Sequence, residues 1–140
     1  MMARLLILLL LVRLPLFGDA EQDITDVITT LTSALSGDNP QLFLKTLDRA
    51  MPNYLQIEHD LTGLASANQI GCSVDLISNS GTATSQQADL DWYMVLSSKQ
   101  DQNLIERRRT KVTIKMEKRG KRWIVTDFNP ISIFSGMTAR

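Results

Sequence analysis

The chain has 140 residues, with 15 lysines and arginines against 15 aspartates and glutamates, one histidine and one cysteine. Hydrophobic residues make up 44% of it and charged residues 21%, the balance of one ordinary globular domain. A single thiol cannot close a disulfide within its own chain, and one histidine with one cysteine cannot fill the usual zinc site. The composition therefore excludes a multidomain enzyme, a disulfide-rich miniprotein and a Cys/His zinc site, and we expect no metal and no cofactor.

The zero net charge hides a difference between the two halves of the chain. Residues 21–91 hold ten acids and two bases, whereas residues 92–140 hold four acids and eleven bases. Nine of those bases fall within residues 107–122, so an anionic partner would be expected to bind there. Nucleic acid is not an expected partner, because residues 21–140 sum to a net charge of −1 and no aromatic ladder interleaves the bases.

The N-terminus has the pattern of an export signal. Arg4 supplies a positive start, Leu5–Val12 is an uninterrupted apolar run, and Gly18 and Ala20 are small residues suited to a cleavage site. The pattern predicts a signal peptide over residues 1–20, cleaved after Ala20, and a single domain over residues 21–140 that is periplasmic or secreted. Arg13 breaks the apolar run well short of the roughly 20 residues of a membrane span, so none is expected. An uncleaved N-terminal membrane anchor is the alternative.

Three helices are predicted in the first half of the domain. The first runs over residues 24–36, with Asp23 as its N-cap and Gly37 as its end. Asp38-Asn39-Pro40 begins a second, short helix, and a third begins after Asn53. The apolar faces consist of Ile24, Val27, Ile28, Leu31 and Leu35, then Phe43, Leu44 and Leu47, then Tyr54, Ile57, Leu61 and Leu64.

After Asn68 the apolar period changes from 3.6 to 2, and it stays at 2 as far as Phe128. Four alternating runs follow one another, at residues 70–76, 90–96, 112–116 and 123–128. Helices first and strands afterwards predict an α+β fold, in which three N-terminal helices pack on a curved, four-stranded antiparallel meander.

The turns predict how the strands pair. A three-residue loop at residues 79–81 would set Cys72 opposite Ala88, and a loop centred on Gln102 would set Trp92 opposite Val112. A two-residue turn at residues 119–120 would set Val112 opposite Asp127. All three turns place the same apolar set on one face.

Four bases lie on the opposite face of this predicted sheet. They are Arg107, Arg109, Lys111 and Lys115, and they can pair with Asp89 and Asp91 of the neighbouring strand. The pattern favours a solvated, ion-paired surface, and a dedicated anion site is the alternative.

Several segments resemble a known superfamily. They are Ile24–Ser36, Cys72–Ser80 with the following residues 81–84, and the closing residues 120–125, while the tail over residues 123–134 is similar to exported bacterial members. The chain resembles the nuclear transport factor 2-like superfamily, a cone-shaped α+β fold, over nearly all of residues 21–140. The resemblance implies a pocket between helices and sheet. It leaves the chemistry open, since ketosteroid isomerase, scytalone dehydratase and polyketide cyclases share that fold with non-catalytic binding domains.

The predicted inward face is apolar except for three polar residues toward one end. The candidate ligand-binding residues are Tyr54, Trp92, Met94, Arg108, Thr110 and Asp127. In one interpretation Asp127 is a weak candidate for a catalytic base and Arg108 holds an anion or a carbonyl. In the other, the two form an ion pair at the strand ends. His59 falls off the buried face of the third helix, so we expect it to be solvated.

Two functions of different classes follow from this face. Many apolar residues with three polar ones favour an exported, non-catalytic domain that binds a hydrophobic small molecule, or that serves as a scaffold and forms a homodimer through its sheet. The alternative is a small isomerase, hydro-lyase or cyclase acting on a hydrophobic substrate, with Asp127 as its base. The two differ in whether the space between the helices and Trp92 is filled or open.

Overall fold

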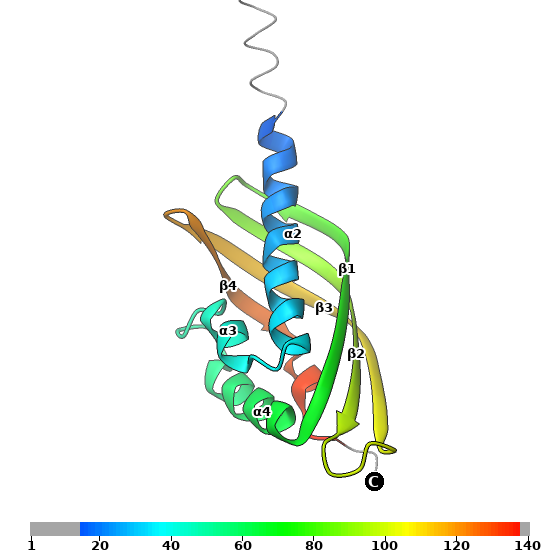
Figure 1. The fold of residues 1–140 in the computed structure, drawn as a ribbon. Coiled ribbons are helices and arrows are strands. Elements are labelled where there is room, and N and C mark those ends of the chain that lie inside the picture. The colour runs from blue at the N-terminus through cyan, green and yellow to red at the C-terminus, as the bar shows by residue number, and fades with distance from the viewer. Residues whose placement is uncertain (1–14, 138–140) are drawn as a thin grey trace, which may run out of the picture.

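A computed structural model describes residues 15–137. Three helices lie on one side of a four-stranded sheet, and the chain closes with a 3₁₀ turn between the two layers (Figure 1). The elements are α2 (Pro15–Ser36), α3 (Pro40–Lys45), α4 (Tyr54–Ala67), β1 (Asn68–Gly81), β2 (Ser85–Ser98), β3 (Ile105–Arg119), β4 (Arg122–Asn129) and the 3₁₀ turn η1 (Ile131–Phe134). The strands pair antiparallel in the order β1-β2-β3-β4, which confirms the predicted α+β meander.

The first helix is longer than predicted. It begins at Pro15 rather than near Ile24, and the predicted cleavage site after Ala20 lies inside it. Proline suits the first position of a helix, because that position needs no backbone donor. The predicted apolar run Leu5–Val12 lies outside the described residues. Within residues 15–137, no helix combines the length and hydrophobicity needed to cross a bilayer.

The two shorter helices begin where the sequence predicts. The side chain of Asn39 accepts a hydrogen bond from the Leu42 amide at 3.2 Å, and Pro40 is the first residue of α3. α4 runs from Tyr54 to Ala67 and is capped by Asn68, whose buried side chain donates to the Leu64 carbonyl at 3.0 Å. These caps fix the helices at the positions from which their apolar faces meet the sheet.

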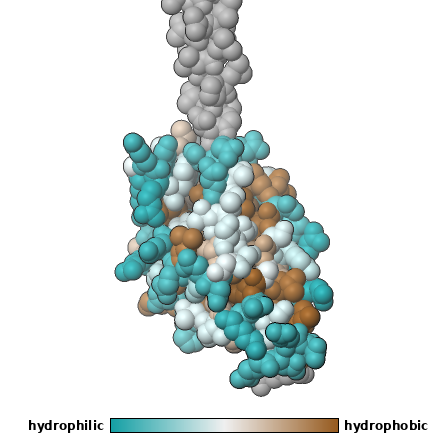
Figure 2. All heavy atoms as spheres, in the orientation of Figure 1, coloured by the Kyte–Doolittle hydropathy of each residue, from teal (hydrophilic) through white to brown (hydrophobic). Residues whose placement is uncertain are grey.

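The core lies between the helices and the inward face of the sheet. Its fully buried large side chains include Ile24, Leu31, Phe43, Ile57, Leu61, Leu90, Trp92, Met94, Leu96, Ile114, Met116 and Phe134. The solvent-facing side of the helix layer carries both hydrophobic and hydrophilic residues (Figure 2). Figure 2 shows that its hydrophobic surface lies in separate patches among hydrophilic residues.

The predicted pairing of β1 with β2 is wrong by six residues. Cys72 pairs with Met94, not Ala88, and the loop consists of residues 82–84. Gly81 is not a loop residue. It ends β1 opposite Gln86, with a φ of 145° at which an added Cβ would lie 2.1 Å from the Ser85 carbonyl. An even displacement preserves which face is buried, because side chains alternate with a period of two.

The predicted pairing of β2 with β3 is wrong by two residues. Trp92 lies opposite Thr110, and Val112 lies opposite Leu90. The loop is closed by a hydrogen bond from the Ser98 amide to the Leu104 carbonyl at 3.0 Å. The inward face is again unchanged.

The third predicted pairing is wrong in a way that changes a face. The ladder between β3 and β4 shifts register between Lys115 and Met116, where Thr126 is the extra residue on β4. Asp127 therefore pairs with the exposed Lys115 rather than with Val112. Phe128 turns inward in its place and is buried.

Candidate functional site

The predicted pocket between the helices and Trp92 is filled by aromatic side chains. Phe43 of α3, Trp92 of β2, Phe128 of β4 and Phe134 of η1 meet there, and all four are buried. Their ring centroids lie 5.2 to 6.5 Å apart, and five of the six ring pairs are edge-to-face. This is the favourable geometry for aromatic pairs, so the rings occupy the space as a packed core.

One polar atom inside this aromatic cluster has no partner. The Nε1 of Trp92 is buried and makes no hydrogen bond within the described part of the chain. An unsatisfied buried donor costs free energy, since it loses its hydrogen bond to water without a replacement. Of the predicted site residues, Trp92, Met94 and Tyr54 are buried, and Thr110 is half-buried.

Arg108 binds the chain itself, on both sides of Phe134. Its guanidinium donates to the carbonyls of Ile133, Ser135 and Gly136 at 2.8, 2.6 and 2.9 Å. Its Nε donates to the carboxylate of Glu106, and the side chains of both residues are largely buried, at 11% and 13% exposure. Arg108 therefore pairs with Glu106 and not with Asp127.

The remaining polar candidates do not converge on the interior. Asp127 leaves the inward face because of the bulge at Thr126. The side chain of His59 is 85% exposed, and its Nδ1 lies 3.3 Å from Asp60. Sequence reasoning also missed Phe134. Its signal was the apolar run after Pro130, which needs burial once the last strand has ended.

The outer face of the sheet carries a ladder of ion pairs. Arg109 donates to Asp91 at 2.6 and 3.1 Å, and this hydrogen bonding lowers the pKa of Asp91. Asp89 accepts from Thr113 at 2.8 Å, which lowers its pKa, and its carboxylate lies 3.4 Å from Lys111. Of the four predicted outward bases, Arg109 and Lys111 pair with Asp91 and Asp89, whereas Arg107 and Lys115 pair with neither aspartate.

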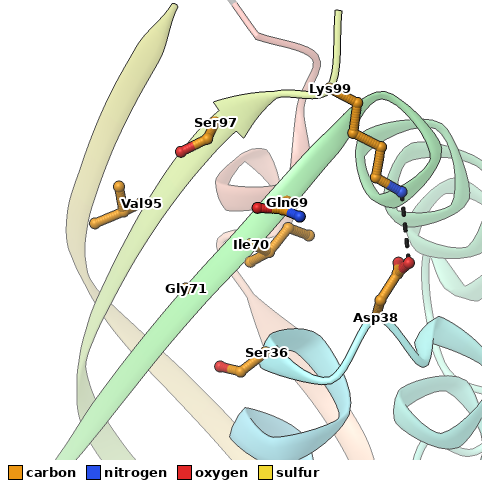
Figure 3. A pocket seen from close by; sticks show the side chains of 8 residues that line it. All are labelled: Ser36, Asp38, Gln69, Ile70, Gly71, Val95, Ser97 and Lys99. Atoms are coloured by element: carbon orange, nitrogen blue, oxygen red, sulfur yellow. Dashed lines mark hydrogen bonds and ion pairs between the residues drawn. The ribbon is translucent and has the colours of Figure 1, made fainter. Parts of the chain in front are cut away.

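A groove of about 490 Å³ lies on the surface where β1 passes the junction of α2 and α3 (Figure 3). The Nζ of Lys99 lies 3.4 Å from Asp38 across its rim and also donates to the Ala65 carbonyl at 3.0 Å. The Cys72 amide donates to Ser36 Oγ at 3.2 Å, which ties the edge of β1 to the end of α2. The two rim charges neutralise each other, and none of the predicted site residues lines this groove.

The lone thiol lies on β1, next to this groove. Cys72 is half-buried and free, and burial raises its pKa to about 12. The thiol is therefore protonated at neutral pH and is a poor nucleophile.

The sequence matches no protein-family model and no curated protein. The structure is similar to a conserved protein from Planctomyces limnophilus, with a TM-score of 0.71 and 7% identity over 79% of this chain and 94% of that one. It is similar to a nuclear transport factor 2-like superfamily protein from Salmonella enterica, with a TM-score of 0.63 and 13% identity over 88% and 96% of the two chains. A third neighbour is an NTF-2 like protein of unknown function from Shewanella oneidensis, with a TM-score of 0.60 and 9% identity over 78% and 96%. The chain therefore has the nuclear transport factor 2-like fold, which is used by ligand-binding proteins and by some enzymes.

Proposed function

We propose that the chain is an exported, non-catalytic scaffold domain that self-associates through the outer face of its sheet. The observation that carries this proposal is the filled interior, where four packed rings occupy the space in which a substrate would have to lie. The polar groups that chemistry would need are elsewhere. Arg108 holds its own backbone, and Asp127, the base of the enzyme alternative, lies opposite Lys115. A domain without such groups functions by binding another protein chain and not by catalysis.

Part of the outer face carries residue types that are common in interfaces. Tyr93 and Val95 lie side by side with Arg109 and Arg107 of β3, and aromatic and arginine side chains are enriched in protein interfaces. Both side chains on β2 are half-buried. They provide an apolar centre that a second copy would cover.

The arrangement of charges on this face is complementary to that of a second copy of the same face. Acids lie on β1 and β2, at Asp75, Asp89 and Asp91, and bases lie on β3. Within residues 15–137, Arg107 and Lys115 form no ion pair, and Asp75 faces Asp91 across the ladder. A two-fold stacking of two such faces would set the unpaired bases of one copy against the acids of the other.

The oligomeric state in solution tests this proposal. We expect the purified chain to sediment as a dimer, and we expect Tyr93→Glu to make it monomeric by placing a charge in the apolar centre. The matched control is Leu55→Glu on α4, because Leu55 is 76% exposed on the helix side. A wild-type protein that stays monomeric at about 100 μM, far above the Kd of a specific dimer, contradicts the proposal, and so does equal dissociation by both variants.

Export is a separate part of the proposal. Its support is the sequence of Arg4, the apolar run Leu5–Val12 and the small residues Gly18 and Ala20. A half-buried, protonated Cys72 suits an oxidising compartment, because an exposed thiolate there would cross-link chains.

A further inference from the structure

The two edges of the sheet end differently. β4 forms one edge, and residues 46–48 lie along it, with Leu47 in a parallel bridge to Val125. The Val125 amide donates to the Thr46 carbonyl at 2.9 Å, and the Val125 carbonyl accepts from the Asp48 amide at 2.8 Å. β1 forms the other edge, and within residues 15–137 no strand pairs with it on its outer side. The chain therefore covers one edge of its sheet with a short extended segment and leaves the other edge open.

One contact shows which backbone groups of β1 face away from the sheet. The Cys72 amide donates to Ser36 Oγ at 3.2 Å, so it points away from β2. The N–H and C=O groups of an antiparallel strand alternate in direction along the strand, so those of Ile70, two residues earlier, point away from β2 as well. Within residues 15–137, the backbone of Ile70 makes no hydrogen bond on that side. Ile70 thus offers the same two groups with which Val125 holds residues 46–48.

The groove of about 490 Å³ lies along this part of the edge (Figure 3). Both faces of the sheet contribute to its lining, because Ile70 is buried on the inward face whereas Gly71 and Val95 belong to the outer face. Gly71 keeps the outer side open, since even an added Cβ would stay 3.9 Å from the Val95 carbonyl. A groove lined from both faces has the shape required by a strand beside the edge, whose side chains alternate between the two faces.

The two ends of this stretch favour a short occupant. At one end Ser36 Oγ accepts the hydrogen bond of the Cys72 amide, in the place that a neighbouring strand would take. At the other end the Asn68 amide donates to the Leu64 carbonyl and caps α4. The open backbone between them is centred on Ile70. A segment as short as residues 46–48 fits there, whereas the long edge of a second sheet would collide with the end of α2.

The charges around the groove favour an uncharged segment. Lys99 and Asp38 lie 3.4 Å apart at its rim and compensate each other. β1 carries one charged residue, Asp75, and has no lysine, arginine or proline, the residues that commonly protect a free edge from pairing. Neutral β-branched residues suit such a place, because they favour the extended conformation.

We propose that the edge of β1 at Ile70 binds a short, neutral, extended segment of another protein, which adds to the sheet as an extra strand. The N–H and C=O groups of Ile70 form the two hydrogen bonds, and one side chain of the segment lies over Gly71. This inference goes beyond the proposed self-association and does not depend on it, because backbone groups of β1 carry it. Of the residues named for the proposed dimer interface, only Val95 also lines this groove.

The test uses acetyl-Thr-Val-Thr-Val-Thr amide, a neutral peptide of β-branched residues. It is titrated into the isotope-labelled full chain, and into Tyr93→Glu so that a dimer cannot cover Val95, while amide hydrogen exchange is followed by NMR. We expect excess peptide to slow exchange of the Ile70 amide at least about tenfold. The Val74 amide, which also points outward but lies outside the groove, should be unaffected. The control peptide has the same side chains with a methyl group on every backbone nitrogen, and it should not bind.

Two variants of the protein locate the site. Proline at an outward-facing amide removes that donor without breaking the ladder to β2. We therefore expect Ile70→Pro to bind the peptide about tenfold more weakly and Val74→Pro to bind it as wild type does.

Three results overturn the inference. They are unchanged exchange at Ile70 in both wild type and Tyr93→Glu, equal binding of the methylated peptide, and equal weakening by Ile70→Pro and Val74→Pro. If Ile70→Pro does not fold, the exchange measurement and the methylated peptide decide. The oligomeric state is measured separately, so failure of this inference and failure of the proposed dimer are distinguishable.

Discussion

Trp92 belongs to the aromatic cluster and is the largest fully buried side chain on β2. It is fully buried and contacts the rings of Phe43, Phe128 and Phe134. We expect Trp92→Ala to lower the free energy of unfolding by about 3–5 kcal/mol, because it removes a large apolar surface and leaves a cavity. Urea unfolding followed by far-ultraviolet circular dichroism measures this loss.

Lys111 is the matched control for that measurement. It lies on the outward side of β3, with 63% of its side chain exposed, and it contacts Asp89 at 3.4 Å. We expect Lys111→Ala to leave the urea midpoint almost unchanged, since exposed ion pairs contribute little. Similar losses at Trp92 and Lys111 would mean that the two faces of the sheet have been assigned incorrectly.

Cys72 gives a second prediction for a single residue. Burial raises its pKa from 9.0 to about 12, so the folded protein holds about a thousandfold less thiolate below pH 9 than the unfolded chain does. We expect alkylation by iodoacetamide at pH 8 to be roughly 100- to 1000-fold slower in the native protein than in guanidinium. Equal rates in the two states would show that the thiol is accessible in the fold.

Among the elements, the β2–β3 ladder contributes to how the protein responds to acid, beside Asp48, whose pKa is lowered by its hydrogen bond from Arg119. The pKa values of Asp89 and Asp91 lie below the ordinary 3.8, because Thr113 and Arg109 bond to their carboxylates. The unfolded chain therefore binds protons at a higher pH than the native one does. The stabilisation is complete above the ordinary pKa and is lost as the pH falls toward the lowered values.

We expect the thermal midpoint to be constant near pH 6 and to fall as the pH is lowered below about 4. Asp91→Asn should make this fall shallower, because the variant has no carboxylate there to protonate. Asp75→Asn is the control, since Asp75 is the outward neighbour of Asp91 and accepts no hydrogen bond within residues 15–137. An equally steep acid transition in wild type and Asp91→Asn would rule out this origin.

The same elements show what a sequence can predict about this fold. Alternation identified the four strands and, except at the end of β4, their buried face, because that pattern depends only on whether a residue's position in the strand is odd or even. Pairing depends on where each turn lies. At residues 82–84, the Oγ1 of Thr82 accepts from the amides of Ser85 and Thr84 at 3.1 and 3.4 Å. Gly81 precedes this turn instead of lying within it, so the position of the glycine misplaces the loop.

The candidate site was harder to predict than the strands. One inserted residue, Thr126, was enough to exchange Asp127 for Phe128 on the inward face, and no sequence signal marks that bulge. Trp92, Met94 and Tyr54 were placed correctly, since apolar periodicity identifies them. The contact of Arg108 with residues 133–136 joins segments far apart in the chain, so no local pattern predicts it.

We expect the fold of residues 21–137 to be independent of the first turns of α2. The buried side chains described on α2 begin at Ile24, and the hydrogen bond from Trp123 to Asp23 at 3.0 Å also lies beyond Ala20. Cleavage after Ala20 would shorten the helix and leave these contacts in place. We therefore expect an exported protein that starts at Glu21, with a thermal midpoint within about 2 °C of the full chain, as for a change outside the core.

N-terminal sequencing of exported material and melting curves of both forms check these two expectations. The processed form keeps every described buried residue of α2, so its folding enthalpy should match that of the full chain as well. Recovery of only the full-length chain, in the membrane fraction, would mean that Arg13 and Pro15 prevent processing and that the N-terminus is an anchor. A processed form with a much lower midpoint would instead show that residues 15–20 pack against the hairpin at residues 79–83, beside which Ala20 lies.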